Sequence, residues 1–365
     1  KVSLPPFAQS AMDGYAVRAT DTHGASADDP RWLTLVGEVQ AGASDDLPEV
    51  GPEQAVRIFT GARVPPGADA VIRQERAERD GDALGVLDVV SAGNDIRPVG
   101  EELEEQTKLV SAGTRLDERH LAALSMTGHE DVHVRRRPEV ALLVSGDEVV
   151  EPGRALAPGE IYDANTPFVC GFLERTCGVR PDVIKIEDDP DVVRNALDRA
   201  LDDYDLVIST GGVSVGDYDF FTSVAVDIGA EEVFWKVSQK PGKPVFFATR
   251  DGTPFLGLPG NPGAVFVGAH AYLARIIDEL EGVSGVRPRW KAGRLSGPLD
   301  RSRTRARWAP CRVEVDADGV NTLHPIERGR AHRMSQLYRA EALVLVREGE
   351  GEIAAGERVL WCGVC

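Results

Sequence analysis

The sequence predicts a multidomain protein of the α/β plus β class, in which a central doubly wound α/β domain is flanked by β-rich domains. From about residue 138 to residue 280, short apolar runs alternate with helical periodicity, which is typical of a parallel sheet with connecting helices. Residues 31–90 and 286–365 show short strands separated by Gly and Pro turns instead. At roughly 100 to 200 residues per domain, the chain of 365 residues is long enough for two to four hydrophobic cores.

The strands and helices of the central region follow from its apolar pattern. Pro190 begins a helix in which Val193, Leu197 and Leu201 recur every fourth residue on one face. Pro262 begins a second, long apolar helix. The predicted strands are Val140 to Val144, Val183 to Ile186, Leu206 to Ile208, Val233 to Trp235, Val245 to Ala248 and Phe255 to Leu258.

The regions on either side are rich in short strands. Leu33 to Val36 and Ala70 to Ile72 are predicted strands of the first region. Leu343 to Val346 and Val359 to Trp361 are late strands of the second. Residues 115–128 have a helical pattern and connect the first β-rich region to the α/β region. The expected domains are a linking domain formed by residues 1–30 and 103–137, a β-rich domain at 31–102, the α/β domain at 138–285 and a C-terminal β domain at 286–365.

Composition and charge exclude several classes of protein. Hydrophobic residues make up 42% of the chain and charged residues 27%, which indicates an ordered globular protein rather than a disordered one. The formal charge of −18 repels nucleic acids and acidic membrane surfaces, so an anionic ligand needs a local cluster of cations. The sequence has no apolar stretch near the roughly 18 to 20 residues of a membrane span, and no signal-peptide pattern. We therefore expect a cytoplasmic protein that binds neither nucleic acid nor membrane.

The cysteines and histidines give no sign of a metal site. Five cysteines fit the reduced thiols of a cytoplasmic protein. Cys362 and Cys365 form a CxxC pair, but a single pair without accompanying histidines favours structural thiols over a metal site. The seven histidines show no ligand spacing and are expected to be ordinary surface or core residues.

A glycine-rich loop follows the predicted strand at Leu206 to Ile208 and reads STGGVSVGDYD over residues 209–219. Ligands of open α/β sheets bind beyond the carboxyl ends of the strands, and glycines let backbone N–H groups approach an anion closely. The alternative is a tight strand-to-helix turn without a ligand. The loop matches neither the Walker pattern nor the GxGxxG dinucleotide-binding pattern. Its candidate residues are Thr210, Gly211, Gly212 and Ser214.

A cluster of lysines lies between two predicted strands. The chain contains seven lysines, and three of them, Lys236, Lys240 and Lys243, fall within eight residues. A solvated charged surface is the usual explanation of such a run. Here Pro241 and Gly242 prevent a regular helix, and the chain is otherwise strongly acidic. We therefore favour an oxyanion or phosphate site over the solvated surface.

Carboxylates stand at matching positions after three of the predicted strands. Because the carboxyl ends of parallel strands meet at one edge of a sheet, these side chains are expected to converge and to bind Mg²⁺, which would bring an anionic substrate into an acidic cleft. The alternative is helix capping, which we assign to Asp189 because Pro190 follows it. The remaining carboxylates are Asp147, Glu148, Asp188, Asp217 and Asp219.

These loops and several strings rich in Pro and Gly occur in a collinear order that resembles one known family. The strings are PPFAQSAMDGYAVR, RIFTGARVPPGADAVI, NDIRPVGEE, LLVSGDEV, IYDANTP, STGGVSVGDYD, KPGKP and GLPGNPGAV. From about residue 3 to residue 280 the chain is similar to the molybdopterin molybdenumtransferase family, the bacterial MoeA type that includes the E domain of the scaffold protein gephyrin. The resemblance implies a molybdopterin-binding α/β domain. It also implies that molybdate is inserted into adenylylated molybdopterin and that AMP is released, with a divalent cation, Mg²⁺.

The resemblance implies a set of site residues, each at a position that matches a family motif. Catalytic roles are implied for Asp13, Thr60, Glu102, Glu148, Asp188, Asp219, Lys236 and Lys240. Of these, Asp13, Glu102 and Glu148 are implied to hold Mg²⁺. Contacts to the pterin substrate or to molybdate are implied for Thr210, Gly211, Gly212, Ser214, Lys243, Pro259, Pro262 and Ser335.

The chain departs from the family pattern in three places. Ala8-Gln9 replaces the usual Asp-Asn pair, and the string GEE replaces GED, so Glu102 reaches one methylene further. In the last domain Arg303, Arg307 or neither corresponds to the family's arginine. The resemblance further implies a homodimer and contacts with other proteins of molybdenum cofactor synthesis.

Two functions from other classes stay open as alternatives. One is a scaffold that binds pterin without catalysis, which the full set of carboxylates disfavours because a carrier need not keep metal ligands. The other is a nucleotide pyrophosphatase on the same α/β core, which the strings AMDGYA and RIFTGA disfavour because the core alone would not need them.

Overall fold

The computed structural model describes residues 2–43, 46–213, 220–326 and 337–364, and the chain divides into two compact units, Lys1–His133 and Val134–Cys365. Each unit is described by itself. Among the described residues, every helix is too short or too polar to cross a membrane. The four cysteines in the described ranges are free thiols, as the composition predicts.

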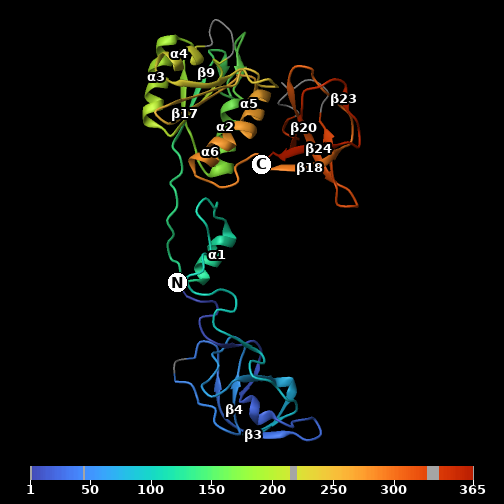
Figure 1. Cartoon of the computed structure of the whole chain (residues 1–365). Helices are drawn as coiled ribbons and strands as arrows, with labels where there is room; N and C mark the ends of the chain where they lie inside the picture. The colour runs from blue at the N-terminus through green and yellow to red at the C-terminus, as the bar shows by residue number, and fades with distance from the viewer. Residues whose placement is uncertain (1, 44–45, 214–219, 327–336, 365) are drawn as a thin grey trace. The chain divides into compact units, whose positions relative to one another are not determined.

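The first unit is built on a six-stranded sheet with the order β5-β2-β4-β3-β7-β6 (Figure 1). The predicted strands in this region are confirmed within β3 and β5. Successive residues of β2 enter different cores because side chains alternate across a sheet: Tyr15 and Val17 pack in one cluster and Ala16 in another. The strands are β2 (Gly14–Val17), β3 (Arg31–Val39), β4 (Gln54–Ile58), β5 (Ala70–Arg73), β6 (Ala77–Asp80) and β7 (Ala83–Val86).

The rest of this unit consists of short elements and one helix. The helix is shorter than the predicted 115–128, because Asp117 is its N-cap and accepts hydrogen bonds from the backbone N–H groups of Arg119 and His120. β2 lies in the expected linking domain, yet it pairs with β4 and β5 of the expected β-rich domain. The division of the chain into four domains stays a prediction. The elements are β1 (Gln9–Ser10), η1 (Ala19–Thr22), η2 (Gln74–Arg76), β8 (Ile96–Arg97) and α1 (Glu118–Met126).

The second unit begins with a six-stranded sheet of order β12-β9-β13-β17-β16-β14. All six predicted strands occur in it. Four strands pair in parallel as predicted, but near one edge β16 runs in the opposite direction and pairs antiparallel with both β17 and β14. Asp251 and Gly252 join β16 to β17 with positive φ values of 52° and 91°, a tight hairpin that is too short for a parallel crossover. The strands are β9 (Val140–Ser145), β12 (Asp182–Ile186), β13 (Leu206–Thr210), β14 (Glu231–Trp235), β16 (Phe246–Arg250) and β17 (Thr253–Leu258).

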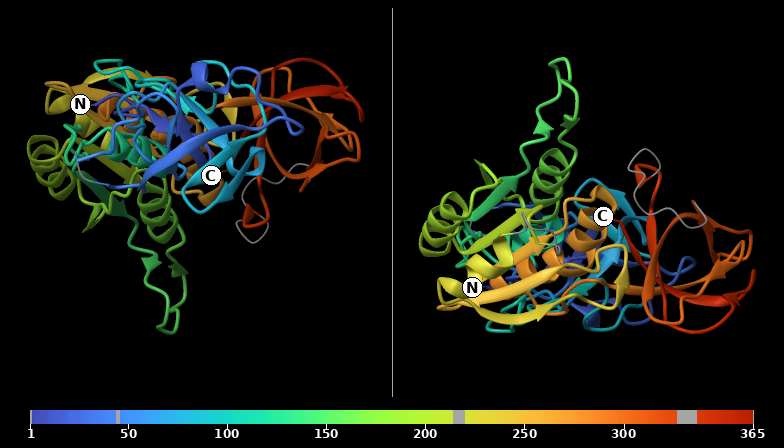
Figure 2. Two further views of the ribbon diagram at one scale, coloured as in Figure 1. Left: turned by 90° about the horizontal axis from the view of Figure 1, so that it is seen from below. Right: turned by 90° about the horizontal axis from the view of Figure 1, so that it is seen from above.

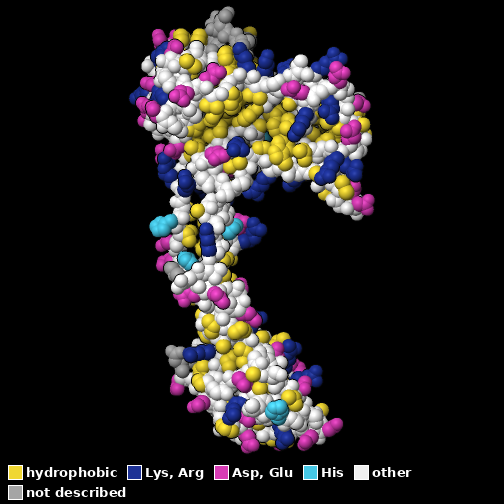
Figure 3. Space-filling view, viewed as in Figure 1, with side chains coloured by type: hydrophobic (Ala, Val, Ile, Leu, Met, Phe, Trp, Pro, Cys, Tyr) yellow, Lys and Arg dark blue, Asp and Glu magenta, His cyan; other side chains and the backbone are white. Residues whose placement is uncertain are grey.

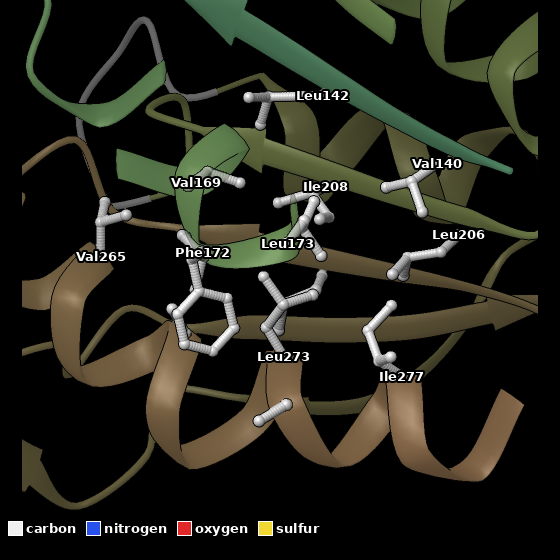
Figure 4. Close-up of a cluster of buried hydrophobic side chains, with 14 of the residues drawn as sticks. Val140, Leu142, Val169, Phe172, Leu173, Leu206, Ile208, Val265, Leu273 and Ile277 are labelled. Atoms are coloured by element: carbon white, nitrogen blue, oxygen red, sulfur yellow. The ribbon is translucent and has the colours of Figure 1, made fainter. Parts of the chain in front are cut away.

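Helices cover both faces of this sheet. The predicted helices at Pro190 and Pro262 are confirmed, whereas α2 and α4 were not predicted. Figure 4 shows the core on one face, where Phe172 of α2 and Leu273 and Ile277 of the last helices point toward strand residues such as Ile208. α3 and α4 enclose the second core on the other face. The helices are α2 (Asn165–Cys177), α3 (Pro190–Asp203), α4 (Phe221–Asp227), α5 (Pro262–Gly268), the π-helical turn η3 (Ala269–Leu273) and α6 (Ala274–Leu280).

Between β9 and α2 the chain projects beyond the sheet and its helices (Figure 2). This segment contains a short parallel pair, β10 (Val149–Val150) and β11 (Ile161–Tyr162). The Tyr162 hydroxyl donates a hydrogen bond of 2.7 Å to the carbonyl oxygen of Arg154, which holds the projecting turn to its base.

The C-terminal part of the second unit is a sheet of order β15-β20-β21-β18-β24-β22 that closes on itself, because β20 also pairs with β22. The predicted late strands are confirmed as β22 and β24. Figure 3 shows hydrophobic side chains gathered where α2, α5 and α6 border this sheet. The strands of this sheet are β15 (Gln239–Lys240), β18 (Trp290–Leu295), β20 (Ala306–Val315), β21 (Asn321–Pro325), β22 (Ala342–Val346) and β24 (Arg358–Gly363). A separate antiparallel pair is formed by β19 (Leu299–Asp300) and β23 (Glu352–Ile353).

Candidate functional site

A pocket of about 440 Å³ lies at the carboxyl ends of β9 and β13, the edge where open α/β sheets bind ligands. Its walls come from the loop after β9, the segment from β11 into α2, and the glycine loop after β13. Its lining residues are Val144, Ser145, Gly146, Glu148, Val149, Ile161, Tyr162, Asp163, Ala164, Asn165, Asp188, Thr210, Gly211, Gly212, Gly260 and Pro262. Six predicted site residues, Glu148, Asp188, Thr210, Gly211, Gly212 and Pro262, are therefore brought together.

The glycine loop reaches this pocket because its backbone adopts conformations that side chains disfavour. Gly211 and Gly212 have φ values of 96° and 64°. A Cβ atom at Gly212 would lie 2.5 Å from the Phe221 ring, and one at Gly211 would lie 3.2 Å from the Ser145 hydroxyl. The Gly211 N–H also donates a hydrogen bond of 2.9 Å to the carbonyl oxygen of Leu258. Only glycine fits this close approach of three segments.

Two buried polar atoms in the pocket wall indicate a ligand. Within the described part of the chain, Thr210 Oγ1 and Asn165 Oδ1 are buried without a hydrogen-bond partner. The Asn165 amide is oriented by its Nδ2, which donates a hydrogen bond of 2.9 Å to the carbonyl oxygen of Gly260. A buried polar atom without a partner costs about 1–3 kcal/mol, which a polar ligand would recover. Residue patterns missed Asn165, although it lies in the string IYDANTP.

The carboxylates in and beside the pocket lie close enough to repel one another. Burial, followed by the charge of Asp147, raises the pKa of Asp188, and the charge of Glu148 adds to this. The Asp147 backbone N–H and the Ser145 hydroxyl donate hydrogen bonds to Asp188 and partly oppose that rise in pKa. Glu148 is exposed at the pocket rim. Carboxylates crowded in this way favour a ligand that is cationic or donates hydrogen bonds.

Two other carboxylates near the pocket have structural roles. Asp189 Oδ1 accepts hydrogen bonds from the backbone N–H groups of Asp191 and Val192, at 2.9 and 3.0 Å, which confirms its predicted role as the N-cap of α3. Asp163 lines the pocket, but its Oδ1 accepts hydrogen bonds from the N–H groups of Asn165 and Thr166 at the start of α2. Neighbouring carboxylates at one sheet edge thus have different functions.

The predicted carboxylates of the first unit lie in its surface turns. The Thr60 N–H and hydroxyl both donate hydrogen bonds of 2.8 Å to Asp13 Oδ1, and these bonds lower the pKa of Asp13. Glu102 is exposed, and its N–H donates a hydrogen bond of 2.9 Å to the carbonyl oxygen of Leu4. The structure thus brings Asp13 and Thr60 together.

The donor set for a divalent cation is divided between the units. Asp13 and Glu102 belong to the first unit and Glu148 to the second. Across the described ranges, no group of three or more His, Cys, Asp or Glu residues could hold a metal ion. Oxygen donors suit Mg²⁺, and Glu148 stands beside Asp188 in the pocket. Binding of Mg²⁺ by Asp13, Glu102 and Glu148 therefore stays a prediction.

The three lysines follow β14 and are all exposed. The Lys236 ammonium lies 3.7 Å from the centroid of the Trp235 ring. Lys240 is the second residue of β15, where it pairs with Arg307 of β20, and Lys243 follows Gly242 in the next turn. None of the three belongs to the described pocket lining.

The remaining predicted residues lie at the end of β17 or outside the described ranges. Pro259 is buried directly after β17. Pro262 is the first residue of α5, where the Asn261 side chain accepts a hydrogen bond of 2.9 Å from the Gly263 N–H. Ser214, Asp219 and Ser335 lie outside the described residues.

Three family models match consecutive parts of the chain. The MoeA N-terminal region (domain I and II) matches residues 1–128, the probable molybdopterin binding domain matches 141–279, and the MoeA C-terminal region (domain IV) matches 292–362. Together they cover both units and include the pocket.

Relatives and solved structures match the chain over nearly its full length. A molybdopterin molybdenumtransferase from a Nostoc species is 34% identical over 98% of this chain and 83% of its own. One from Staphylococcus epidermidis is 29% identical over 98% of this chain and 84% of its own. The crystal structure of a MoeA molybdopterin biosynthesis protein from Pyrococcus horikoshii covers 100% of this chain and 89% of its own, with a TM-score of 0.83 and 29% identity.

Proposed function

The chain belongs to the molybdopterin molybdenumtransferase family, and from this premise we propose how its residues contribute to molybdenum insertion. Insertion of molybdenum during synthesis of the molybdenum cofactor is the reaction of this enzyme. The observation that carries the proposed site is the pocket at the ends of β9 and β13, which lies in the part of the chain that matches the molybdopterin binding domain.

The pocket is proposed to bind the pterin end of adenylylated molybdopterin. A pterin ring carries an amino group and ring N–H groups, which can donate hydrogen bonds to Asn165 Oδ1, to Thr210 Oγ1 and to the Asp188 carboxylate. The backbone of Gly211 and Gly212 forms part of the same wall, and this glycine turn is proposed to lie against the phosphate end of the substrate. Ser214, in the same glycine-rich sequence, is proposed to contact the phosphate end, and Asp219 is proposed to orient the pterin or its nucleotide.

Molybdate and the diphosphate are proposed to meet the lysine cluster that follows β14. The chain is strongly acidic, so a dianion such as molybdate needs the lysine cluster to offset repulsion from nearby carboxylates. Lys236, Lys240 and Lys243 are proposed to hold molybdate and to neutralise charge on phosphate oxygens. A catalytic role is proposed for Thr60, and contacts to the substrate are proposed for Pro259 and Ser335, from their matches to the family's motifs.

The proposed divalent cation is Mg²⁺, held by Glu102 and Glu148 with Asp13. When bound, Mg²⁺ would neutralise negative charge on the diphosphate. The hydrogen bonds from Thr60 keep Asp13 ionised, which suits an oxygen ligand. A homodimer, a cytoplasmic location and contacts with other proteins of cofactor synthesis belong to the same proposal.

Release of AMP tests this function against its two alternatives. Purified protein would be incubated with adenylylated molybdopterin, with and without molybdate, and AMP would be measured by chromatography. The proposed enzyme releases AMP only when molybdate is present. Release without molybdate would instead indicate a nucleotide pyrophosphatase, and tight pterin binding without any release would indicate a scaffold.

A further inference from the structure

The strand that carries Lys240 connects the α/β part of the second unit to its C-terminal sheet. β15 pairs in parallel with β20, so that Gln239 lies opposite Ala306 and Lys240 opposite Arg307. The Ala306 N–H donates a hydrogen bond of 3.0 Å to the carbonyl oxygen of Ser238. The loop from Lys240 to Lys243, here called the lysine loop, is therefore attached to a sheet whose other strands all come from residue 290 onward.

The side chain of Gln239 makes hydrogen bonds to three separate segments at this junction. Its Oε1 accepts one of 2.5 Å from the Tyr272 hydroxyl of η3 and one of 3.2 Å from Trp308 Nε1 of β20. Its Nε2 donates one of 3.3 Å to the carbonyl oxygen of Gly242, inside the lysine loop. Only 3% of Gln239 is exposed, so these bonds form away from competing water.

The two donors to Gln239 are themselves fixed in place. Trp308 stacks on Trp290 with ring centroids 5.9 Å apart, and it packs in a cluster with Phe266 of α5. Burial raises the pKa of Tyr272 to about 12, so its hydroxyl keeps the proton that it donates. Gln239 is thus tied to rigid elements on one side and to the loop of the lysines on the other.

We propose that Gln239 is a positioning residue, which holds the loop from Lys240 to Lys243 at the junction of the two sheets so that both ammonium groups face the anionic substrate. This rests on the proposed role of the lysines. Lys240 is bonded to Gln239 through the chain, and Gly242, which accepts the Gln239 hydrogen bond, directly precedes Lys243. Both lysines are exposed long side chains, so the backbone of the loop sets the space that their ammonium groups can reach.

The test compares molybdate binding to variants of the full chain by isothermal titration calorimetry at fixed ionic strength. Gln239→Met keeps the side-chain volume but removes all three hydrogen bonds, and we expect molybdate affinity to fall about tenfold. Tyr272→Phe removes only one donor and should give about a threefold loss. Tyr204→Phe is the matched control, because its hydroxyl donates a hydrogen bond of 2.9 Å to Asp182 at the opposite edge of the sheet. The control should bind molybdate like the wild type.

A double-mutant cycle separates positioning from general stability. If Gln239 acts through the two lysines, Gln239→Met should cause little further loss in a background that carries both Lys240→Gln and Lys243→Gln. Additive losses, or unchanged affinity in Gln239→Met, would overturn the proposal while leaving the lysine site intact. If Gln239→Met does not fold, the same cycle with Tyr272→Phe decides. Wild-type protein that binds no molybdate, or Lys240→Gln that binds it normally, would refute the proposed lysine site and the positioning role with it.

Discussion

Replacing Asp188 by Asn should make the protein slightly more stable and a weaker pterin binder. Asp188 is partly buried beside Asp147 and Glu148, and its raised pKa shows that the folded protein disfavours its charge. Asn removes that charge but keeps an oxygen for the hydrogen bonds from Ser145 and Asp147. Because the site is partly exposed and therefore screened, the gain in the free energy of unfolding at pH 7 should stay below about 1 kcal/mol.

The pH dependence of this gain has a definite sign. A carboxyl group whose folded pKa is raised stabilises the fold below its unfolded pKa, near 3.8, and loses that contribution as the pH rises through the folded pKa. Wild type and Asp188→Asn should therefore be equally stable at the acidic end of a urea unfolding series. The variant should become the more stable protein toward neutral pH.

Pterin binding should change in the opposite direction. Loss of a charged hydrogen bond costs about 1.5–3 kcal/mol, which corresponds to roughly tenfold to hundredfold weaker binding in a fluorescence titration. Asp189→Ala is the adjacent control: it removes the cap of α3, so stability should fall by about 0.5–2 kcal/mol while pterin affinity stays unchanged. A variant Asp188→Asn that is less stable than wild type at pH 7, or that binds pterin normally, would refute the reasoning.

Three further variants test other parts of the second unit. Burial lowers the pKa of His270 to about 4, so the free energy of unfolding should fall by about 3 kcal/mol as the pH drops from 6.5 to 4. Urea unfolding of His270→Leu should not show this loss. Asp278, which is 2% exposed, accepts three hydrogen bonds from Arg287, and Asp278→Ala should cost about 3–5 kcal/mol in the same assay. Gly212→Ala should abolish pterin binding in titrations because its Cβ would lie 2.5 Å from a ring carbon, whereas Gly171→Ala, with open space around it, should bind normally.

Local patterns in the sequence were sufficient for the central strands and for the helices that begin at Pro190 and Pro262. A run such as Val140 to Val144 is buried on both faces of the sheet and reads as continuously apolar. The N-cap role of Asp189 was also predictable, because it depends on backbone N–H groups two and three residues later. Interactions within a few residues can be read from neighbours in the chain. The same holds for the Gly211-Gly212 turn, whose backbone conformation excludes larger residues.

Other features depended on segments that only the fold brings together. Residue patterns identified the lysine cluster, but they did not show that β15 would pair with β20 or that Gln239 would bond to Tyr272 and Trp308. Asn165 likewise becomes a candidate ligand because the carbonyl of Gly260, 95 positions away, orients its amide. The sequence by itself determined the family, the strands and the acidic and basic groups, because these follow from local residue types and their order. The tertiary structure alone decided which polar atoms are buried without partners and which loops are held in place, because burial and orientation are set by contacts between residues distant in the chain.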